Sequence, residues 1–278
     1  MDIGVLINVH ADMNFKNEFE KIREMQLDSC QVCIWNTDFY TEENAKAILD
    51  AKAATGIKVS ALWAGWSGPS VWDFVDGPLT LGLVPAVYRF ARMKELMAAS
   101  DFAEKIAISD VITHVGFIPE NLNDPDYIGV VSAIRYVANY MKAKGQFFLF
   151  ETGQETPTTL LRTIEDVGTG NLGINFDTAN VILYGKANPV DAAAIYGRYV
   201  RNMHCKDGEF PVDGRNLGHE VPLGQGKAHM AEVLKILWEA GYKGPLTIER
   251  EISGEQQIRD IEMARDYLIR ILKDLGTV

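Results

Sequence analysis

Residues 146–177 read QFFLFETGQETPTTLLRTIEDVGTGNLGINFD, which is an apolar run, a helical-period segment and a second apolar run. Both apolar runs have the length of a strand, and they end in acids, at Glu151 and Asp177. Between them, Thr156 and Pro157 form a typical helix start, with a capping side chain before a proline in the first turn. This order indicates a strand, a crossover helix and a second, parallel strand.

The same unit recurs along the chain, and we count eight strand–helix pairs. Strands are predicted at 3–9, 29–35, 57–63, 111–116, 146–151, 172–177, 199–204 and 245–249. Helices are predicted at 15–26, 41–54, 86–107, 126–144, 157–167, 188–197, 227–241 and 254–275. The segments 64–85 and 205–226 are long for plain connections, and both follow strands.

Eight such units in 278 residues predict an α/β fold, a single (β/α)8 TIM barrel that forms one domain over residues 1–278. The alternative is an open, doubly wound sheet. That sheet calls for a glycine fingerprint after the first strand, where Asn8-Val9-His10-Ala11-Asp12 stands instead. In a barrel, both long segments would lie on the catalytic face.

Composition excludes several classes of protein. With 47% hydrophobic and 23% charged residues, the chain is neither disordered nor collagen-like. A net charge of −11 without a basic block disfavours nucleic acid and anionic membrane surfaces as partners. The first residues carry an acid where a secretory signal needs positive charge, and no segment reaches the roughly 18 apolar residues of a membrane span. We therefore expect a cytoplasmic protein.

The three cysteines, Cys30, Cys33 and Cys205, cannot all pair with one another, which fits a reducing compartment. Cys30 and Cys33 lie in a strand-like stretch, and no second pair completes a zinc site. Their spacing places them on opposite faces of the strand. We expect neither a redox pair nor a metal site from them.

The last four predicted strands each end in a side chain that is costly to bury: Glu151, Asp177, His204 and Glu249. A salt bridge or a cap would explain one such residue, but not four at the same position of separate units. In a barrel these residues converge on one rim, where three carboxylates would repel each other unless a cation were bound. We predict that all four bind one divalent metal. Mn²⁺ is the ion we expect, and Mg²⁺, Co²⁺ or Zn²⁺ would also accept these ligands.

The chain resembles the xylose-isomerase-like barrels, a family of sugar isomerases, sugar epimerases and sugar-phosphate isomerases and epimerases. The resemblance covers the whole chain and is strongest over 146–251. It is carried by FETG at 150–153, NFDTAN at 175–180, HCKDG at 204–208, VPLGQG at 221–226 and GYKGPLTIERE at 241–251.

The resemblance implies the same four metal ligands, with Glu151 and Glu249 flanking the substrate carbon that loses its proton. It also implies a homo-oligomer. The chain departs from the relatives that epimerise free ketoses at one position. Those relatives have a histidine three residues after the aspartate of strand 6, and this chain has Asn180.

The predicted function is a divalent-metal-dependent isomerase or epimerase of a sugar or keto-sugar, with Glu151 and Glu249 as the catalytic residues. A metal that chelates a carbonyl and the neighbouring hydroxyl stabilises an ene-diolate, so a carboxylate suffices as the base. Two glutamates on opposite faces would epimerise a carbon, and one glutamate shuttling a proton on one face would isomerise an aldose to a ketose. The residues leave this choice open.

Other side chains near strand ends are predicted to bind the small-molecule sugar: His10, His114, Trp35, Trp63 and Lys206. Barrel packing is the alternative for these tryptophans and for Trp66, and an ion pair with Asp207 is the alternative for Lys206. We expect His219 and His229 at the surface. Gly224-Gln225-Gly226 is a weak candidate for phosphate binding, and an ordinary helix-entry turn is the favoured interpretation.

Three other functions are alternatives. A metal-dependent lyase or dehydratase acting on a keto-sugar, a keto-inositol or a 3-keto glycoside would use the same site. An abasic-site endonuclease needs more histidines than five and a positively charged surface. A sugar-binding barrel without activity would not need all four ligands.

Overall fold

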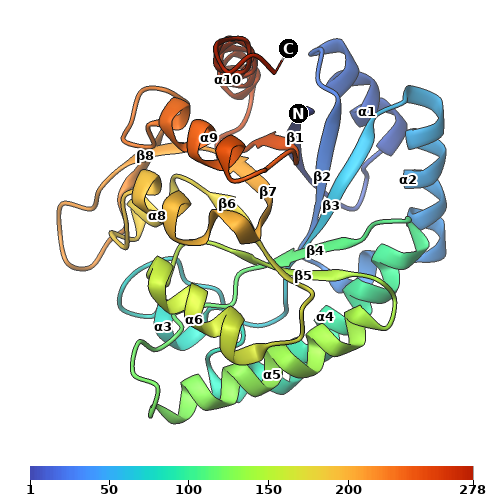
Figure 1. Cartoon of the computed structure of the whole chain (residues 1–278). Helices are drawn as coiled ribbons and strands as arrows, with labels where there is room; N and C mark the ends of the chain where they lie inside the picture. The colour runs from blue at the N-terminus through green and yellow to red at the C-terminus, as the bar shows by residue number, and fades with distance from the viewer. Residues whose placement is uncertain (278) are drawn as a thin grey trace.

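The computed structural model describes residues 1–277, and within them eight parallel strands close into a barrel in the order β1-β10-β7-β6-β5-β4-β3-β2. The helices surround these strands (Figure 1). The predicted (β/α)8 TIM barrel is confirmed. The barrel strands are β1 (Ile3–Asn8), β2 (Ser29–Ile34), β3 (Lys58–Ala64), β4 (Asp110–Thr113), β5 (Phe147–Glu151), β6 (Leu172–Asp177), β7 (Val200–Cys205) and β10 (Leu246–Ile248).

The longer helices are α1 (Phe15–Glu24), α2 (Glu42–Thr55), α4 (Ala86–Lys105), α5 (Pro125–Lys142), α6 (Pro157–Val167), α8 (Pro189–Tyr196), α9 (Met230–Glu239) and α10 (Glu255–Asp274). Local sequence explains several of their ends. The Thr41, Asp124 and Thr156 side chains cap α2, α5 and α6 by accepting backbone N–H groups. Gly56 ends α2 in the left-handed conformation, as expected for a C-cap glycine.

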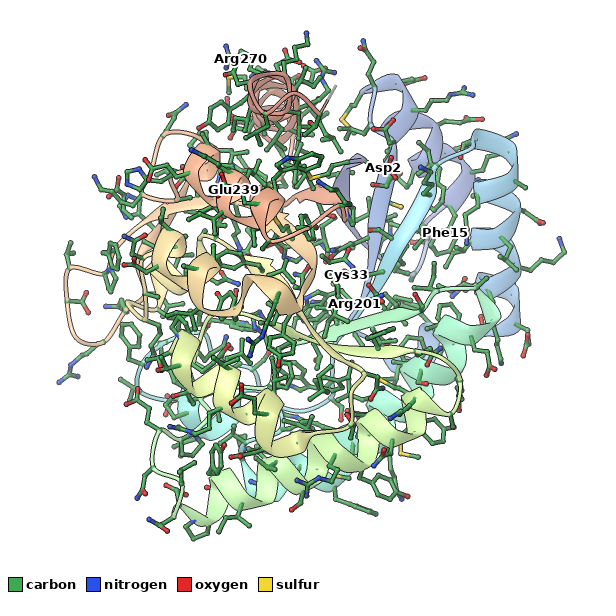
Figure 2. The ribbon with its side chains drawn as sticks, viewed as in Figure 1. Asp2, Phe15, Cys33, Arg201, Glu239 and Arg270 are labelled. Carbon is green, nitrogen blue, oxygen red and sulfur yellow. The ribbon has the colours of Figure 1, made fainter. Side chains whose placement is uncertain are left out.

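The core has two layers. The larger layer lies between the barrel and the helices, and a smaller one lies inside the barrel. Figure 2 shows side chains filling the space between strands and helices. Cys30 belongs to the outer layer and Cys33 to the inner one, so these two free cysteines lie on opposite faces of β2, as predicted.

Several elements differ from the prediction. β4 ends at Thr113 instead of 116, because the Val115 carbonyl accepts hydrogen bonds from the amides of Leu83 and Val84 in the long segment 64–85. The helix predicted at 227–241 starts at Met230, after His229 in a left-handed conformation. The remaining short elements are α3 (Gly77–Thr80), α7 (Asn180–Leu183) and two 3-10 turns (Thr37–Phe39 and Gly197–Tyr199).

The segment 205–226 is more ordered than a loop, since β8 (Asp207–Glu209) and β9 (His219–Val221) pair as an antiparallel hairpin. It touches the other long segment, where the Phe74 amide donates to the Arg215 carbonyl at 3.1 Å. Both segments follow strands and adjoin the cavity described below. In the part of the chain that the structure describes, no helix combines the length and the apolar character needed to cross a bilayer.

Candidate metal centre and active site

Four side chains from four strands meet at the carboxyl end of the barrel. Glu151 and Asp177 end β5 and β6, His204 lies in β7, and Glu249 directly follows β10. One ligand atom from each lies within 4.8 Å of all the others. The first three side chains are buried, and that of Glu249 is 11% exposed. The four predicted metal ligands therefore form one cluster.

The imidazole of His204 turns its Nδ1 toward the acids. This nitrogen lies 2.8 Å from Glu151 Oε1, 3.2 Å from Glu249 Oε2 and 3.7 Å from Asp177 Oδ2. The opposite nitrogen, Nε2, lies 2.7 Å from Gln31 Oε1. Because an amide oxygen only accepts, Nε2 carries the proton and Nδ1 is left to face a cation.

The orientation of the Gln31 amide follows from its neighbours. Asn175 Nδ2 donates to Glu151 Oε2 at 3.0 Å, and Asn202 Nδ2 donates to Asp110 Oδ2 at 2.9 Å. Their amide oxygens must therefore face Gln31, whose Nε2 donates to them at 3.1 and 3.4 Å. This buried network fixes the tautomer of His204 from inside the barrel.

The charges of the cluster call for a cation. Burial, and then the charges of Glu249 and Glu151, raise the pKa of Asp177 to about 7, against the lowering effect of Lys206. Burial alone would lower the pKa of His204, but Glu151 and Glu249 raise it well above 6.5. Asp177 Oδ2 is buried and has no hydrogen-bond partner among the described residues. A divalent cation would occupy this place and satisfy that oxygen, so the donor set fits a metal.

Lys206 is buried next to the acids of the cluster. Its Nζ is 3.1 Å from Glu249 Oε2, 3.0 Å from Glu251 Oε1 and 3.7 Å from Asp177 Oδ2. The side chain is 1% exposed and is not part of the cavity lining within residues 1–277. Lys206 thus compensates the charge of the acids, and it pairs with none of the atoms of the adjacent Asp207 in the described chain. Its predicted contact with substrate stays a prediction.

Asp207 instead organises the turn that enters α9. Its carboxylate accepts the amides of Gly208, Gly224, Gly226 and Ala228 at 2.8–3.0 Å. A side chain on Gly226 would place its Cβ 2.4 Å from Asp207 Oδ1, so only glycine fits there. These amides already hold a carboxylate, which supports the helix-entry interpretation over phosphate binding.

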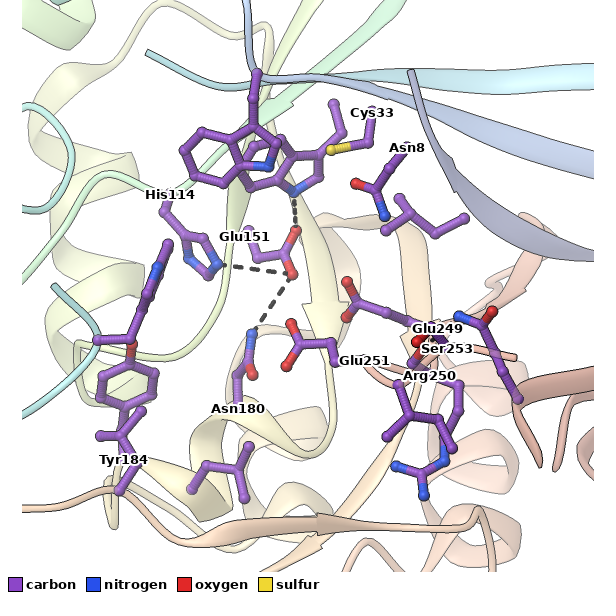
Figure 3. A pocket seen from close by; sticks show the side chains of 18 residues that line it. Asn8, Cys33, His114, Glu151, Asn180, Tyr184, Glu249, Arg250, Glu251 and Ser253 are labelled. Carbon is purple, nitrogen blue, oxygen red and sulfur yellow. Dashed lines mark hydrogen bonds and ion pairs between the residues drawn. The ribbon is translucent and has the colours of Figure 1, made fainter. Parts of the chain in front are cut away.

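A cavity of about 620 Å³ opens over the cluster. Trp35, Trp63 and His114 line it, together with Glu151 and Glu249. Figure 3 shows His114 and Tyr184 on one side, Glu249, Arg250 and Ser253 on the other, and Glu151 and Asn180 between them.

His10 is exposed and lies outside the cavity lining, because the chain turns after β1, with the Met13 amide donating to the His10 carbonyl. Asn8, from the end of the same strand, lines the cavity instead. His219 and His229 are exposed, as expected.

Glu151 is held from several sides. The Trp63 Nε1–H and the Asn175 amide donate to its Oε2. Its Oε1 lies 3.5 Å from Asn180 Nδ2 and 3.9 Å from His114 Nε2 (Figure 3). Burial raises the pKa of Glu151, but His204 and then His114 outweigh this and lower it below 4.5. Glu151 is therefore fixed and ionised, with one oxygen directed at the cluster.

Sequence reasoning missed two residues of this site. Gln31 was not singled out, although a polar side chain in the middle of an apolar strand is expected to have a specific hydrogen-bond partner. Trp72 also lines the cavity, and only its place in a tryptophan-rich segment after β3 pointed to it.

Comparisons with known proteins identify the family and the fold of this chain. Residues 19–270 match the family described as xylose isomerase-like TIM barrel. A xylose isomerase domain protein from Planctomyces limnophilus is 39% identical, with a TM-score of 0.92 over 100% of this chain and 99% of that one. An uncharacterised protein from Methanocaldococcus jannaschii is 23% identical over 96% of this chain and 89% of its own length. A D-tagatose 3-epimerase-like protein is 20% identical, with a TM-score of 0.75 over 99% and 98%.

More distant structures share the fold alone. They include a barrel protein from Mycobacterium smegmatis in complex with magnesium, at 16% identity and a TM-score of 0.74 over 98% of this chain and 97% of that one. They also include 3-keto-D-glucoside 4-epimerase from E. coli, at 16% identity and a TM-score of 0.72 over 97% of this chain and 99% of that one. A probable 3-DHS dehydratase from Bacillus anthracis is 14% identical, with a TM-score of 0.68 over 96% of this chain and 99% of that one.

Proposed function

The chain belongs to the xylose isomerase-like TIM-barrel family, and we propose that it is a divalent-metal-dependent isomerase or epimerase of a sugar or keto-sugar. One observation carries the proposal. Glu151 and Glu249 belong to the same buried cluster and also line the same cavity, so both can reach one substrate carbon. A purely structural cluster would not need two of its acids at the cavity surface.

Glu151, Asp177, His204 and Glu249 would hold the cation, and Mn²⁺ is the ion we propose. When bound, a divalent cation supplies positive charge that stabilises the anion formed as a proton leaves the carbon beside a carbonyl. The same charge would replace the protons that His204 and Asp177 otherwise hold.

The two glutamates would move the proton. One carboxylate removes the proton from carbon, and the other, once it has taken a proton from solvent, delivers that proton to the opposite face, which inverts the centre. Return by the same carboxylate to the adjacent carbon would give isomerisation instead. His114 and Asn180, which line the cavity next to Glu151, would hydrogen-bond substrate hydroxyls and hold the sugar against Glu151.

The test is solvent exchange. Protein loaded with Mn²⁺ is incubated in D₂O with ketoses, aldoses and keto-sugars, and carbon-bound deuterium is followed by NMR. We expect deuterium at one carbon together with a new stereoisomer or positional isomer. Glu151→Gln and Glu249→Gln should each abolish exchange, and the exposed His219→Ala should retain it. Near-normal exchange by Glu249→Gln would refute the two-glutamate mechanism.

Elimination is the second candidate, and His114 favours it. This side chain is buried at the cavity, and its Nδ1 has no hydrogen-bond partner within residues 1–277. In an elimination, a glutamate takes the proton from carbon, the electron pair forms a C=C bond as the C–O bond beyond it breaks, and an imidazolium form of His114 protonates the departing hydroxide. Burial lowers the pKa of His114, so this form has to take its proton from solvent before the step. An unsaturated product in the exchange experiment, lost in His114→Ala, would establish this reaction.

A further inference from the structure

Three tryptophans form a continuous wall from the metal centre to the mouth of the cavity. Trp63 donates to Glu151 and is only 4% exposed. Its ring centroid lies 4.9 Å from that of Trp35, which lies 6.2 Å from that of Trp72. Trp35 and Trp72 are 36% and 39% exposed, so the outer part of this wall is uncovered.

The wall is held in place by the rest of the barrel. A Cβ on Gly65 would lie 2.6–2.8 Å from atoms of Trp35, so glycine at this position lets the chain pack directly against that residue. Trp72 packs edge-on against His114, with ring centroids 5.2 Å apart. Exposed aromatic rings held next to a reactive centre are typical of a binding surface for a flat or apolar group.

The charge of the cavity disfavours anionic substrates. Among residues 1–277, Arg250 is the one lysine or arginine in the lining. Its guanidinium is already paired, with Nε 2.7 Å from Asp260 Oδ2 and Nη1 3.0 Å from Glu220 Oε1. Glu251 adds a carboxylate to those of Glu151 and Glu249. A phosphate away from the metal would find no free cation here, and the amides near Gly224 are bound to Asp207.

The cavity is also larger than one monosaccharide. Its volume of about 620 Å³ corresponds to about 20 water molecules at roughly 30 Å³ each. A hexose has about a dozen non-hydrogen atoms, none much larger than a water molecule. A hexose against Glu151 would therefore leave part of this cavity, which Trp35 and Trp72 also line, unfilled.

We propose that the substrate is an uncharged keto-glycoside: the sugar ring that carries the ketone lies at the metal centre, and the second ring packs into the corner formed by Trp35 and Trp72, whose ring planes are 87° apart. This inference rests on the proposed function for the inner half of the cavity. The outer half selects the aglycone, or a second sugar, through its apolar face. Free hexoses and sugar phosphates are weaker ligands than such glycosides.

The test is binding, measured by ligand-observed NMR titration of Mg²⁺-loaded protein. The probes are phenyl β-D-glucopyranoside, methyl β-D-glucopyranoside, D-glucose and D-glucose 6-phosphate. We expect the phenyl glucoside to bind at least about tenfold more tightly than the methyl glucoside, and the phosphate to bind more weakly than glucose. Trp72→Ala should remove the phenyl preference and leave methyl glucoside binding unchanged.

Two further variants control for structural damage. Trp72→Phe should restore most of the phenyl preference, and Trp238→Ala, on the outer helix α9, should not alter it. Equal binding of the two glucosides, a phenyl preference that survives Trp72→Ala, or tighter binding of the phosphate would overturn the inference. The two glucosides have no carbonyl and report binding alone. If the phenyl preference holds but no ketose, aldose or keto-sugar exchanges deuterium, the proposed reaction fails and the glycoside site stands. If a sugar exchanges deuterium but the phenyl preference is absent, the proposed reaction stands and the glycoside site fails.

Discussion

Replacing Gln31 with leucine is expected to weaken metal binding, although Gln31 is not a ligand. Its Oε1 accepts the Nε2–H of His204 at 2.7 Å in a fully buried site. Leucine has a similar size but no acceptor, so that N–H would lose its partner. Because Glu151 and Glu249 raise the pKa of His204, a metal displaces the Nδ1 proton in the wild type and in the variant alike. In the variant, however, the metal-bound imidazole keeps a buried Nε2–H without an acceptor, and its ring is no longer held with Nδ1 toward the acids.

The size of the effect follows from known cases. Loss of the partner that orients a metal-bound histidine costs 10–100-fold in affinity, or about 1.4–2.7 kcal/mol. The same variant removes the donor to Asn175 and Asn202, whose buried amide oxygens lie 3.1 and 3.4 Å from Gln31 Nε2. Each unsatisfied oxygen costs about 1–3 kcal/mol of folding stability.

Calorimetric titration of metal-free protein with Mn²⁺ measures the affinity, and urea unfolding measures the stability. Gln31→Glu is the matched variant, because it retains an oxygen opposite His204 Nε2 but loses the donors. We expect Gln31→Glu to lose stability and to bind Mn²⁺ about as tightly as the wild type. Binding by Gln31→Leu within about twofold of the wild type would refute the role assigned to Gln31.

Other predictions concern the framework of the site. Burial raises the pKa of Glu155 from 4.5 to about 8, so the folded state keeps a proton that the unfolded chain releases, and stability falls as pH rises between these values. The free energy of unfolding in urea should therefore be about 3 kcal/mol higher for Glu155→Gln than for the wild type at pH 7, and equal to it at pH 4. The exposed Glu239→Gln should show no such pH-dependent difference. A difference between Glu155→Gln and the wild type that does not change with pH would contradict this prediction. The buried Arg92 donates to the carbonyls of Thr80, Gly82 and Pro69, so Arg92→Met should lower stability by about 3 kcal/mol, and an unchanged unfolding midpoint would count against it. Asp207→Asn leaves amides without acceptors and should cost about 2–4 kcal/mol in the same assay, with proteolysis showing a loosened 205–226 segment; resistance equal to that of the wild type would show that the carboxylate is dispensable.

Local patterns made most of the barrel predictable. Thr41, Asp124 and Thr156 cap the helices that their sequence context indicated, because a cap acts within one turn of chain. The strand at 111–116 was predicted too long. Its end depends on Val115 bonding to a segment about 30 residues earlier, and no local signal reports that contact.

The four-residue cluster was predictable for a different reason. Each of its residues stands at the end of its own strand, so the repeat itself aligns Glu151, Asp177, His204 and Glu249 on one rim. His10 was also expected near a strand end, but β1 ends at Asn8 and the chain turns after it, so His10 is exposed and lies outside the cavity lining. A position near a predicted strand end indicates a site residue only where the strand extends to that position.

From its sequence alone, then, this chain specified eight strand–helix units, four side chains that converge on one rim of the barrel, and its resemblance to the xylose isomerase-like TIM-barrel family. These features depend on periodicity, caps and strand ends, which are local or repeat with the unit. Closure of the barrel added the rest: Gln31 opposite His204, 173 residues away, the tryptophan wall, and the pairing of Lys206 with three acids. Such contacts join residues that only a closed barrel brings within hydrogen-bond distance, and their energy depends on burial that no stretch of sequence contains.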